Sequence, residues 1–144
     1  MCFPLPNNTI FYDIEKAIKS YRNFAQMQID KSGYEITINQ LLLLFQISEK
    51  PDLSQAELSK ILIKDVASIT RMIQILFEKK YITRKEDKKD RRQKLLLLTK
   101  NGKEVLSNLK VVIKLNREQA LKDFSNEEIT NLSYLLNKLI KNVN

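Results

Sequence analysis

The residues of this 144-residue chain that are best suited to chemistry are basic, and they are concentrated in one short segment. Nine lysines and arginines, against three carboxylates, fall in residues 79–94 of a chain whose formal net charge is +8. Four of the six arginines, Arg71, Arg84, Arg91 and Arg92, lie in or just before that segment. Arginine grips phosphates and guanine edges with a planar fork that lysine lacks. A charge run is usually only a solvated face, but this arginine content favours a polyanionic partner.

Catalysis is not expected from this composition. The absence of histidine removes the most common general base and every Ser-His or Cys-His nucleophile pair. One cysteine, Cys2, without histidine cannot build an ordinary zinc site, and Gly33 and Gly102 are too far apart for a phosphate-binding glycine loop. The carboxylates of Asp87 and Asp90 lie among lysines, where burial cannot tune them as acids. We therefore expect a binding protein and not an enzyme, with no metal and no cofactor.

The sequence also indicates the cellular compartment of the protein. A single cysteine allows no intramolecular disulfide, so a reducing environment is expected. The first residues lack the features of a secretory signal, and the longest apolar run, residues 41–45, is far shorter than the roughly 20 residues of a membrane span. The sequence predicts a cytoplasmic protein without membrane association.

The elements that position the basic segment are predicted to be mainly helical. Three Ser/Thr-x-x-Glu/Gln capping boxes mark helix starts near residues 38, 55 and 126: Thr37 with Gln40, Ser54 with Glu57, and Ser125 with Glu128. Asp65 is predicted to cap a helix that runs to about residue 80, and Thr99 one that begins near residue 100. Apolar residues at helical spacing from Ile10 onward predict a first helix capped by Asn8 or Thr9.

A β-hairpin is predicted between two of these helices. Residues 81–83 are good strand formers, residues 86–91 form a polar tip, and residues 94–98 return as an apolar run. Four consecutive leucines also fit a helix. The hairpin is favoured because Thr99 begins a new helix immediately afterward.

The helix from Asp65 to about residue 80 has two chemically different sides. Its apolar side comprises Val66, Ile69, Met72, Ile73, Leu76 and Phe77. Its other side comprises Ala67, Ser68, Arg71 and Gln74, with Thr70 at the margin. Small residues let a helix enter a DNA major groove, where Arg71 and Gln74 bond to base edges. An ordinary surface helix would carry more Glu and Lys there. The preceding helix, residues 55–62, completes a helix-turn-helix, with Ser54, Gln55 and Lys64 at the DNA backbone.

The terminal helices are predicted to associate. Ile129, Leu132, Leu136, Leu139 and Val143 step by three and four residues, which is the spacing of a helix packed lengthwise on another. Packing against the preceding helix is the alternative. Self-association is favoured because the first and last helices both have apolar faces that a small central module cannot cover.

In these features the chain resembles the MarR family of winged-helix transcriptional regulators. The family's wing pattern, Asp-x-Arg followed by Leu-Thr-x-x-Gly, is present as Asp90 and Arg92, then Leu98, Thr99 and Gly102. The likeness also covers residues 54–58 and 68–71, and it extends in outline to the flanking helices.

The resemblance implies a mainly α fold with a small β-hairpin wing, a winged helix-turn-helix flanked by N- and C-terminal dimerisation helices. It implies a division into residues 1–35, 36–100 and 101–144, and a homodimer on a pseudo-palindromic operator. The wing residues would lie at the minor groove, with Arg92 inserted and Asp90 orienting it. The remaining wing cations would hold phosphates: Lys88, Lys89, Arg91 and Lys94.

Three positions depart from the family pattern. Tyr81 replaces a glycine after the recognition helix, so a left-handed cap there would cost about 1 kcal/mol. Ile75 is apolar where a polar residue is common. Leu95 and Leu97 make both sides of the second wing strand apolar, which suggests that something covers it.

Family resemblance also suggests regulation by a small molecule. Many relatives release DNA when a phenolic or other lipophilic effector binds between the dimerisation region and the winged helix-turn-helix. The candidates for lining such a pocket here are Phe11, Phe24, Met27, Tyr34 and Phe45, although aromatic residues at helical spacing are more often plain core. Cys2 precedes the first helix, so a redox role is not expected.

Together these features predict a sequence-specific, double-stranded-DNA-binding transcriptional regulator, a repressor by family resemblance. The alternative is a winged-helix adaptor that binds an acidic protein partner. Steep salt dependence and sequence preference would separate a DNA reader from an adaptor.

Overall fold

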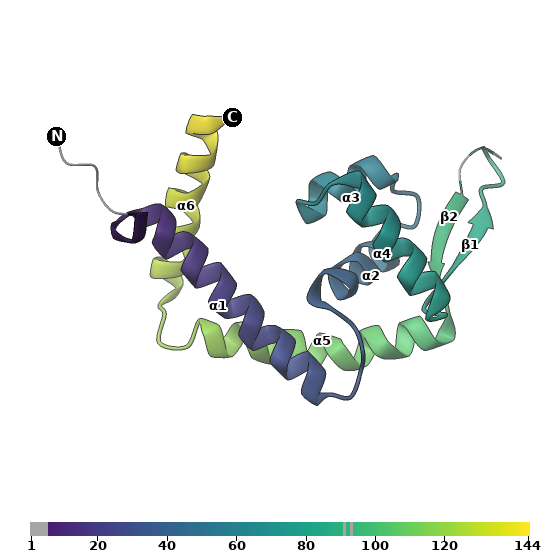
Figure 1. Cartoon of the computed structure of the whole chain (residues 1–144), viewed down its shortest axis with the longest axis horizontal. Coiled ribbons are helices and arrows are strands. Elements are labelled where there is room, and N and C mark those ends of the chain that lie inside the picture. The colour runs from purple at the N-terminus through teal and green to yellow at the C-terminus, as the bar shows by residue number, and fades with distance from the viewer. Residues whose placement is uncertain (1–5, 91, 93) are drawn as a thin grey trace.

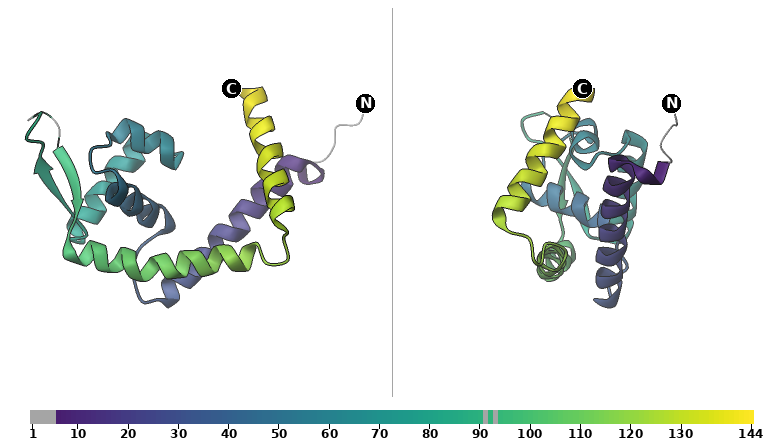
Figure 2. Two further views of the ribbon diagram at one scale, coloured as in Figure 1. Left: turned by 180° about the vertical axis from the view of Figure 1, so that it is seen from behind. Right: turned by 90° about the vertical axis from the view of Figure 1, so that its left-hand side faces the viewer.

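The computed structural model describes residues 6–90, 92 and 94–144, and it is mainly helical with one small hairpin, as predicted (Figure 1). In chain order the elements are a short 3-10 turn η1 (Pro6–Asn8), α1 (Ile10–Lys31), α2 (Ile38–Glu49), α3 (Gln55–Leu62), α4 (Val66–Glu78), β1 (Ile82–Glu86), β2 (Lys94–Leu98), α5 (Lys100–Ala120) and α6 (Asn126–Val143). Helix α5 forms a long base (Figures 1 and 2). Helices α2–α4 and the hairpin stand on one end of it, and α6 rises from the other end beside the start of α1.

Polar caps begin the helices at the predicted positions. The side chains of Thr37 and Ser54 accept hydrogen bonds from the third backbone amide of α2 and α3, and both capping boxes are complete. Ser125 caps α6 in the same way, but the Glu128 carboxylate accepts from the Ser125 hydroxyl rather than from its backbone N–H. The box at α6 is therefore only half formed.

The hydrophobic core lies where α2, α4 and the first half of α5 meet the C-terminal half of α1. Leu44, Ile69 and Leu109 are fully buried there. No described residue of α6 is buried. Two residues on the apolar side of α4, Val66 and Phe77, are nevertheless 46% and 41% exposed. Both lie at the ends of α4, beyond the part of the helix that the core covers.

Helix α4 ends in a left-handed residue, as was considered above for Tyr81. That residue is Lys80, with φ of 61°, and not Tyr81. The Lys80 N–H donates to the Phe77 carbonyl at 3.0 Å and the Tyr81 N–H to the Leu76 carbonyl at 3.0 Å, which is a Schellman ending. The expected strain is therefore present, but one residue earlier.

Thr99 and Gly102 fix this ending to α5. The Thr99 hydroxyl donates to the Lys80 carbonyl at 2.6 Å, and the Thr99 N–H donates to the Tyr81 carbonyl at 3.0 Å. A Cβ at Gly102 would lie 2.0 Å from the Tyr81 carbonyl oxygen. The spacing of Thr99 and Gly102 is thus a steric requirement for seating the start of α5 on the end of α4.

The hairpin pairs β1 and β2 in antiparallel register, with Arg84 opposite Leu96 and Lys85 opposite Leu95. This excludes the helical alternative for residues 94–98. The Leu96 side chain is buried, and its N–H donates to the Pro51 carbonyl at 3.2 Å.

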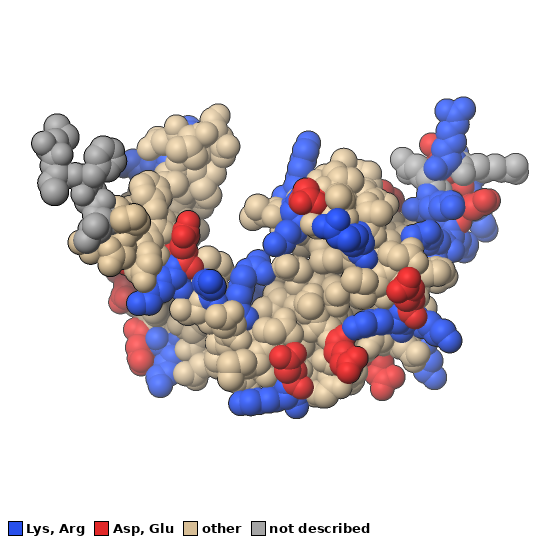
Figure 3. Space-filling model, in the orientation of Figure 1, with Lys and Arg blue, Asp and Glu red and all other residues tan. Residues whose placement is uncertain are grey.

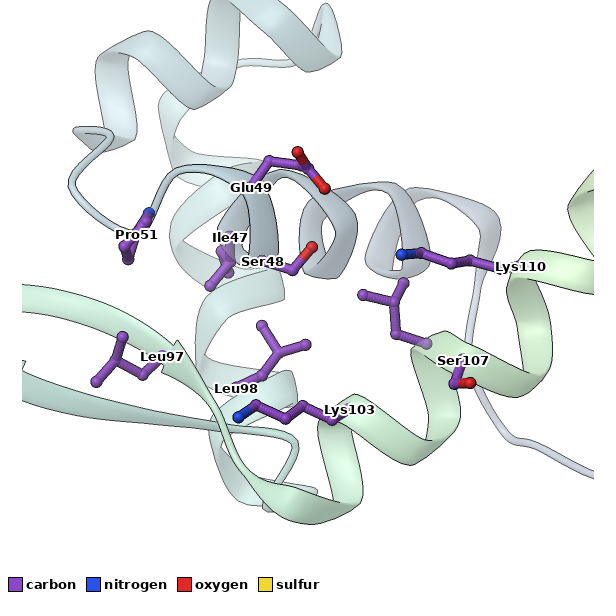
Figure 4. Close-up of a pocket in the computed structure, with 10 residues that line it drawn as sticks. Ile47, Ser48, Glu49, Pro51, Leu97, Leu98, Lys103, Ser107 and Lys110 are labelled. Carbon is purple, nitrogen blue, oxygen red and sulfur yellow. The ribbon is translucent and has the colours of Figure 1, made fainter.

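The strand β2 is only partly covered on its other face. Leu95 and Leu97 are half-buried. Leu97 borders an open hollow of about 500 Å³ between α2, β2 and α5 (Figure 4). Pro51 and Ile47 lie on one side of this hollow and the lysine side chains of α5 on the other. The expected cover over this face is therefore incomplete within the described chain.

No helix in the described part of the chain has the length and apolar character needed to cross a bilayer.

The turn between α3 and α4 is strained. Ile63 has φ of 55° and ψ of 49°, and its side chain is 89% exposed. The Ile63 N–H donates to Lys60 and the Lys64 N–H to Ser59, so this turn is also a Schellman ending. A β-branched residue is poorly suited to the left-handed region.

Replacing Ile63 with glycine should therefore stabilise the protein by about 1 kcal/mol, because glycine relieves the left-handed strain of about 1–2 kcal/mol at some cost in unfolded-state entropy. Urea unfolding at a fixed protein concentration measures this. Lys60→Gly, within the last turn of α3, is the control and should destabilise by about 1 kcal/mol. A loss of stability in Ile63→Gly would show that the turn is not strained.

Candidate nucleic-acid interface

The outward face of α4 carries the predicted reading residues, with one adjustment. Ala67, Arg71 and Gln74 are exposed, whereas Ser68 is half-buried. The Ser68 Oγ accepts a hydrogen bond from Arg71 Nη2 at 3.1 Å. Ser68 therefore orients the arginine, and most of the guanidinium donors stay free on the exposed face. Ile75 is half-buried, as Ser68 is, and its spacing of four residues from Arg71 places it on the same side of α4.

The start of α4 is stabilised by Asp65. Its carboxylate accepts a hydrogen bond from the Ser68 N–H at 2.6 Å. This backbone hydrogen bond, followed by the one from the Ser68 side chain, lowers the pKa of Asp65 below its ordinary value. Asp65 is therefore ionised at neutral pH and holds the first turn, from which Ser68 and Arg71 project.

Thr70 lies at the contact between α3 and α4. Its hydroxyl is 2.5 Å from the Gln55 Oε1 and 2.9 Å from the Val66 carbonyl, both of which are acceptors. The single proton of Thr70 is therefore used within the protein. Gln74 is also engaged, because its Nε2 donates to Glu78 Oε1 at 3.1 Å.

The hairpin tip presents the predicted cations. Lys88, Lys89, Arg92 and Lys94 are exposed, and basic side chains gather over the hairpin (Figure 3). Asp90 accepts from the backbone N–H of Arg92 at 3.0 Å, so its contact with Arg92 is to the main chain. Arg91 lies outside the described residues, as does Cys2.

The third group of predicted residues lies at the start of α3 and in the following turn. Ser54, Gln55 and Lys64 are all exposed. Ser54 and Glu57 bond to each other's backbone amides, and the Ser54 hydrogen bonds, backbone first, lower the pKa of Glu57. Its ionised carboxylate therefore maintains the capped end of α3.

Arg84 was not singled out from the sequence beyond its contribution to the charge run. Its guanidinium carbon lies 5.2 Å from the centroid of the Phe77 ring. Together with Arg92, Lys94 and Gln55 it lines a hollow of about 360 Å³ between the hairpin and α3. The alternation of side chains along the predicted strand could have distinguished Arg84 from Lys85 in the sequence, because the two lie on opposite faces of β1.

The five candidates for an effector pocket are not brought together around one of the described cavities. Phe11 and Met27 are 60% and 56% exposed. Phe24 is half-buried, the Tyr34 hydroxyl accepts from Asn108 at 2.7 Å, and the Phe45 ring lies beneath the Lys110 ammonium at 4.9 Å.

A different cavity lies between α1, α2 and α5. It holds about 100 Å³, and most of its wall is apolar, including Ala25, Leu41 and Ile113. Asn116 lines it, is 97% buried, and has an Nδ2 without a hydrogen-bond partner among the described residues. Arg22 and Arg117 also lie on its wall. This buried amide was missed because it stands among apolar residues and matches no motif.

The described residues contain no group of three side chains arranged to hold a metal ion. The arrangement as a whole is a helix face with an oriented arginine, beside a basic hairpin.

Comparisons with known proteins agree with this geometry. The model of the MarR family matches residues 36–94, so the resemblance seen in the sequence is confirmed. BpsR of Bordetella bronchiseptica, described with a mechanism by which 6-hydroxynicotinic acid regulates its DNA binding, is 20% identical, with a TM-score of 0.82 over 96% of this chain and 97% of its own. A variant of E. coli MarR in complex with operator DNA is 24% identical, with a TM-score of 0.82 over 95% and 99%. A MarR protein of Peptoclostridium difficile is 26% identical, with a TM-score of 0.80 over 99% and 92%.

Proposed function

Because this chain has the winged helix-turn-helix of the MarR-family transcriptional regulators, we propose that it binds double-stranded DNA with sequence preference and represses transcription. The observation that carries the proposal is the oriented Arg71 on the exposed face of α4, next to the basic hairpin. Arg71 and Gln74 read base edges, while Ala67 and Thr70 allow close approach. Lys88, Lys89, Arg91 and Lys94 hold phosphates, and Arg92 enters the minor groove. The variant of E. coli MarR in complex with operator DNA supports the assignment of DNA as the partner.

The chain is proposed to act as a homodimer on a pseudo-palindromic operator. Helix α6 has no buried residue, and its large apolar side chains are exposed: Leu132, Tyr134, Leu135, Ile140 and Val143. Ile10, Phe11 and Ile18 of α1 are exposed as well. Exposed apolar surface on this scale favours a partner that covers it. Residues 1–35 and 101–144 would then form the dimerisation region, and residues 36–100 the DNA-binding domain.

Release by a small effector is proposed for the cavity that Asn116 lines. An unpartnered buried amide in an apolar wall costs free energy, which a ligand with a hydrogen-bond acceptor would recover. The adjacent Arg22 and Arg117 favour an anionic ligand. The regulation of BpsR by 6-hydroxynicotinic acid supports such a ligand class.

An adaptor that binds an acidic protein is the alternative function. The cationic hairpin fits it, but the oriented Arg71 on a face of small residues favours DNA. Steep loss of duplex binding with salt and a discrete footprint would support DNA binding, and weak binding without preference would support the adaptor.

Replacing Arg71 with alanine should weaken binding to a selected genomic fragment by roughly 1–3 kcal/mol and relax base preference, because the bidentate base contact is lost. Footprinting and competition with unrelated duplex DNA measure both effects. Arg71→Lys is the matched control: it should keep the affinity for unrelated duplex while losing the preference. An unchanged footprint in Arg71→Ala would remove Arg71 from the reading face.

A chain that ends at Phe124 should be monomeric and bind half-sites poorly, because the apolar face of α6 is removed. Sedimentation equilibrium measures the mass. Leu132→Glu combined with Val143→Glu tests the predicted stripe in the full chain, and Lys138→Glu, on another side of that helix, is the control that should stay dimeric. A stable dimer in the double variant would show that the dimer interface does not use this face of α6.

Small aromatic carboxylates should raise the melting temperature of the protein and release DNA, through the cavity at Asn116. In Asn116→Leu the melting temperature without ligand should rise and the response to ligand should be lost, because no unpartnered amide remains. Asn101→Leu, on the same helix but exposed and outside the cavity, is the control and should respond normally. Equal responses in all three proteins would place the effector outside this cavity.

A further inference from the structure

The hollow between the hairpin and the start of α3 collects positive charge from three points of the wing. Arg84 comes from β1, Arg92 from the tip and Lys94 from β2. The apolar residues that line the hollow are Leu53, Ile73 and Leu96. One carboxylate, that of Asp52, also lines it. The cations outnumber the single carboxylate around a volume of about 360 Å³, so the hollow favours an anion even when Arg92 is assigned to the minor groove.

Arg84 is held in position without losing its donors. It lies opposite the buried Leu96, so it shares the face of the hairpin that turns toward α4. Its guanidinium carbon lies 5.2 Å from the centroid of the Phe77 ring, a distance at which the ring attracts the cation. Among the described residues the ion pair within 4.0 Å is Lys114 with Glu118, so the Arg84 charge has no such carboxylate partner.

Gln55 adds a neutral donor to the same hollow. Its Oε1 accepts from the Thr70 hydroxyl at 2.5 Å. This orientation leaves the two N–H donors of Nε2 for a group outside the protein. Thr70 is in this respect a positioning residue for Gln55.

Charged and neutral donors from β1, β2 and α3 therefore line one hollow, and we propose that this hollow binds one backbone phosphate of duplex DNA, held chiefly by Arg84 and Gln55. This inference rests on the proposed DNA-binding function and assigns a phosphate contact within it. Donors supplied by three separate elements suit a tetrahedral anion better than the flat edge of a base. The phosphate belongs to DNA because the hollow adjoins both the hairpin and the α3–α4 contact, where a duplex read by Arg71 would pass.

The full-length protein is to be titrated into fluorescent duplex DNA of random sequence over a range of salt concentrations, because a phosphate contact weakens binding equally on all sequences. Arg84→Ala should bind several-fold more weakly. Its plot of log affinity against log salt should be less steep by about one per protomer, hence about two for a dimer. Lys85→Ala, which removes the same charge from the opposite face of β1, is the matched control and should leave the slope nearly unchanged.

Two further variants test the geometry of the hollow. Asp52→Asn removes its one carboxylate and should tighten binding to the same duplex. Thr70→Val frees the Gln55 amide from its orientation and should weaken binding without changing the salt slope, since no charge is lost. Circular dichroism melting establishes that each variant is folded.

The outcomes are separable. If the wild-type protein does not bind duplex DNA at low salt, the proposed function fails. If it binds but Arg84→Ala and Lys85→Ala reduce the slope equally, or neither reduces it, the phosphate assignment alone is overturned. Saturable binding of inorganic phosphate that depends on Arg84 but does not displace DNA would identify a free-anion site and would also overturn it.

Discussion

The contact between the Tyr81 carbonyl and the start of α5 determines how the parts of this protein are placed. The carbonyl accepts the Thr99 N–H and occupies the space that a side chain at Gly102 would need. The Thr99 hydroxyl closes the same joint through the Lys80 carbonyl. Because α4, the hairpin and α5 all meet here, these contacts fix the orientation of α4 relative to α5. The Leu-Thr-x-x-Gly pattern of the sequence is thus explained by hydrogen bonding and steric fit, without reference to DNA.

Several polar groups on the outward face of α4 form hydrogen bonds within the protein. Ser68 bonds to Asp65 and to Arg71, and Thr70 bonds to Val66 and to Gln55. These contacts fix the rotamers of the residues that remain free to bind a partner, so less conformational entropy is lost when a complex forms. Arg71 and the Gln55 amide are left as donors, and the hairpin supplies the charge. The face therefore offers few free groups, but those groups are already oriented.

The sequence predicted the helix starts and the hairpin well because capping and strand formation are local. Thr37, Ser54, Asp65 and Thr99 satisfy backbone amides within one turn of themselves, so their roles follow from spacing alone. The left-handed residues could not be predicted in the same way, since Lys80 and Ile63 have side chains that disfavour that conformation and adopt it only because tertiary packing fixes the turns. The residues of the outward face of α4 were found from periodicity, and their contacts with DNA stay a prediction. Asn116 and the site of Arg84 depend on elements far apart in the chain, which periodicity does not bring together.

Hydrogen bonds attach α1 to the start of α2 beside the apolar core, and this has a consequence for regulation. Gln26 of α1 donates to the Ile36 carbonyl and accepts from the Ile38 N–H, and Arg22 donates to Asn39 at 2.9 Å. Arg22 also lines the cavity of Asn116, so one side chain serves both the cavity and the start of α2. A ligand that drew the Arg22 guanidinium toward an anionic group would compete with Asn39 for it, and hydrogen bonds permit such an exchange at a smaller cost than apolar interdigitation does. The proposed effector would thus act by weakening the attachment of α1 to α2, which alters the placement of the reading helix without touching the DNA-binding face.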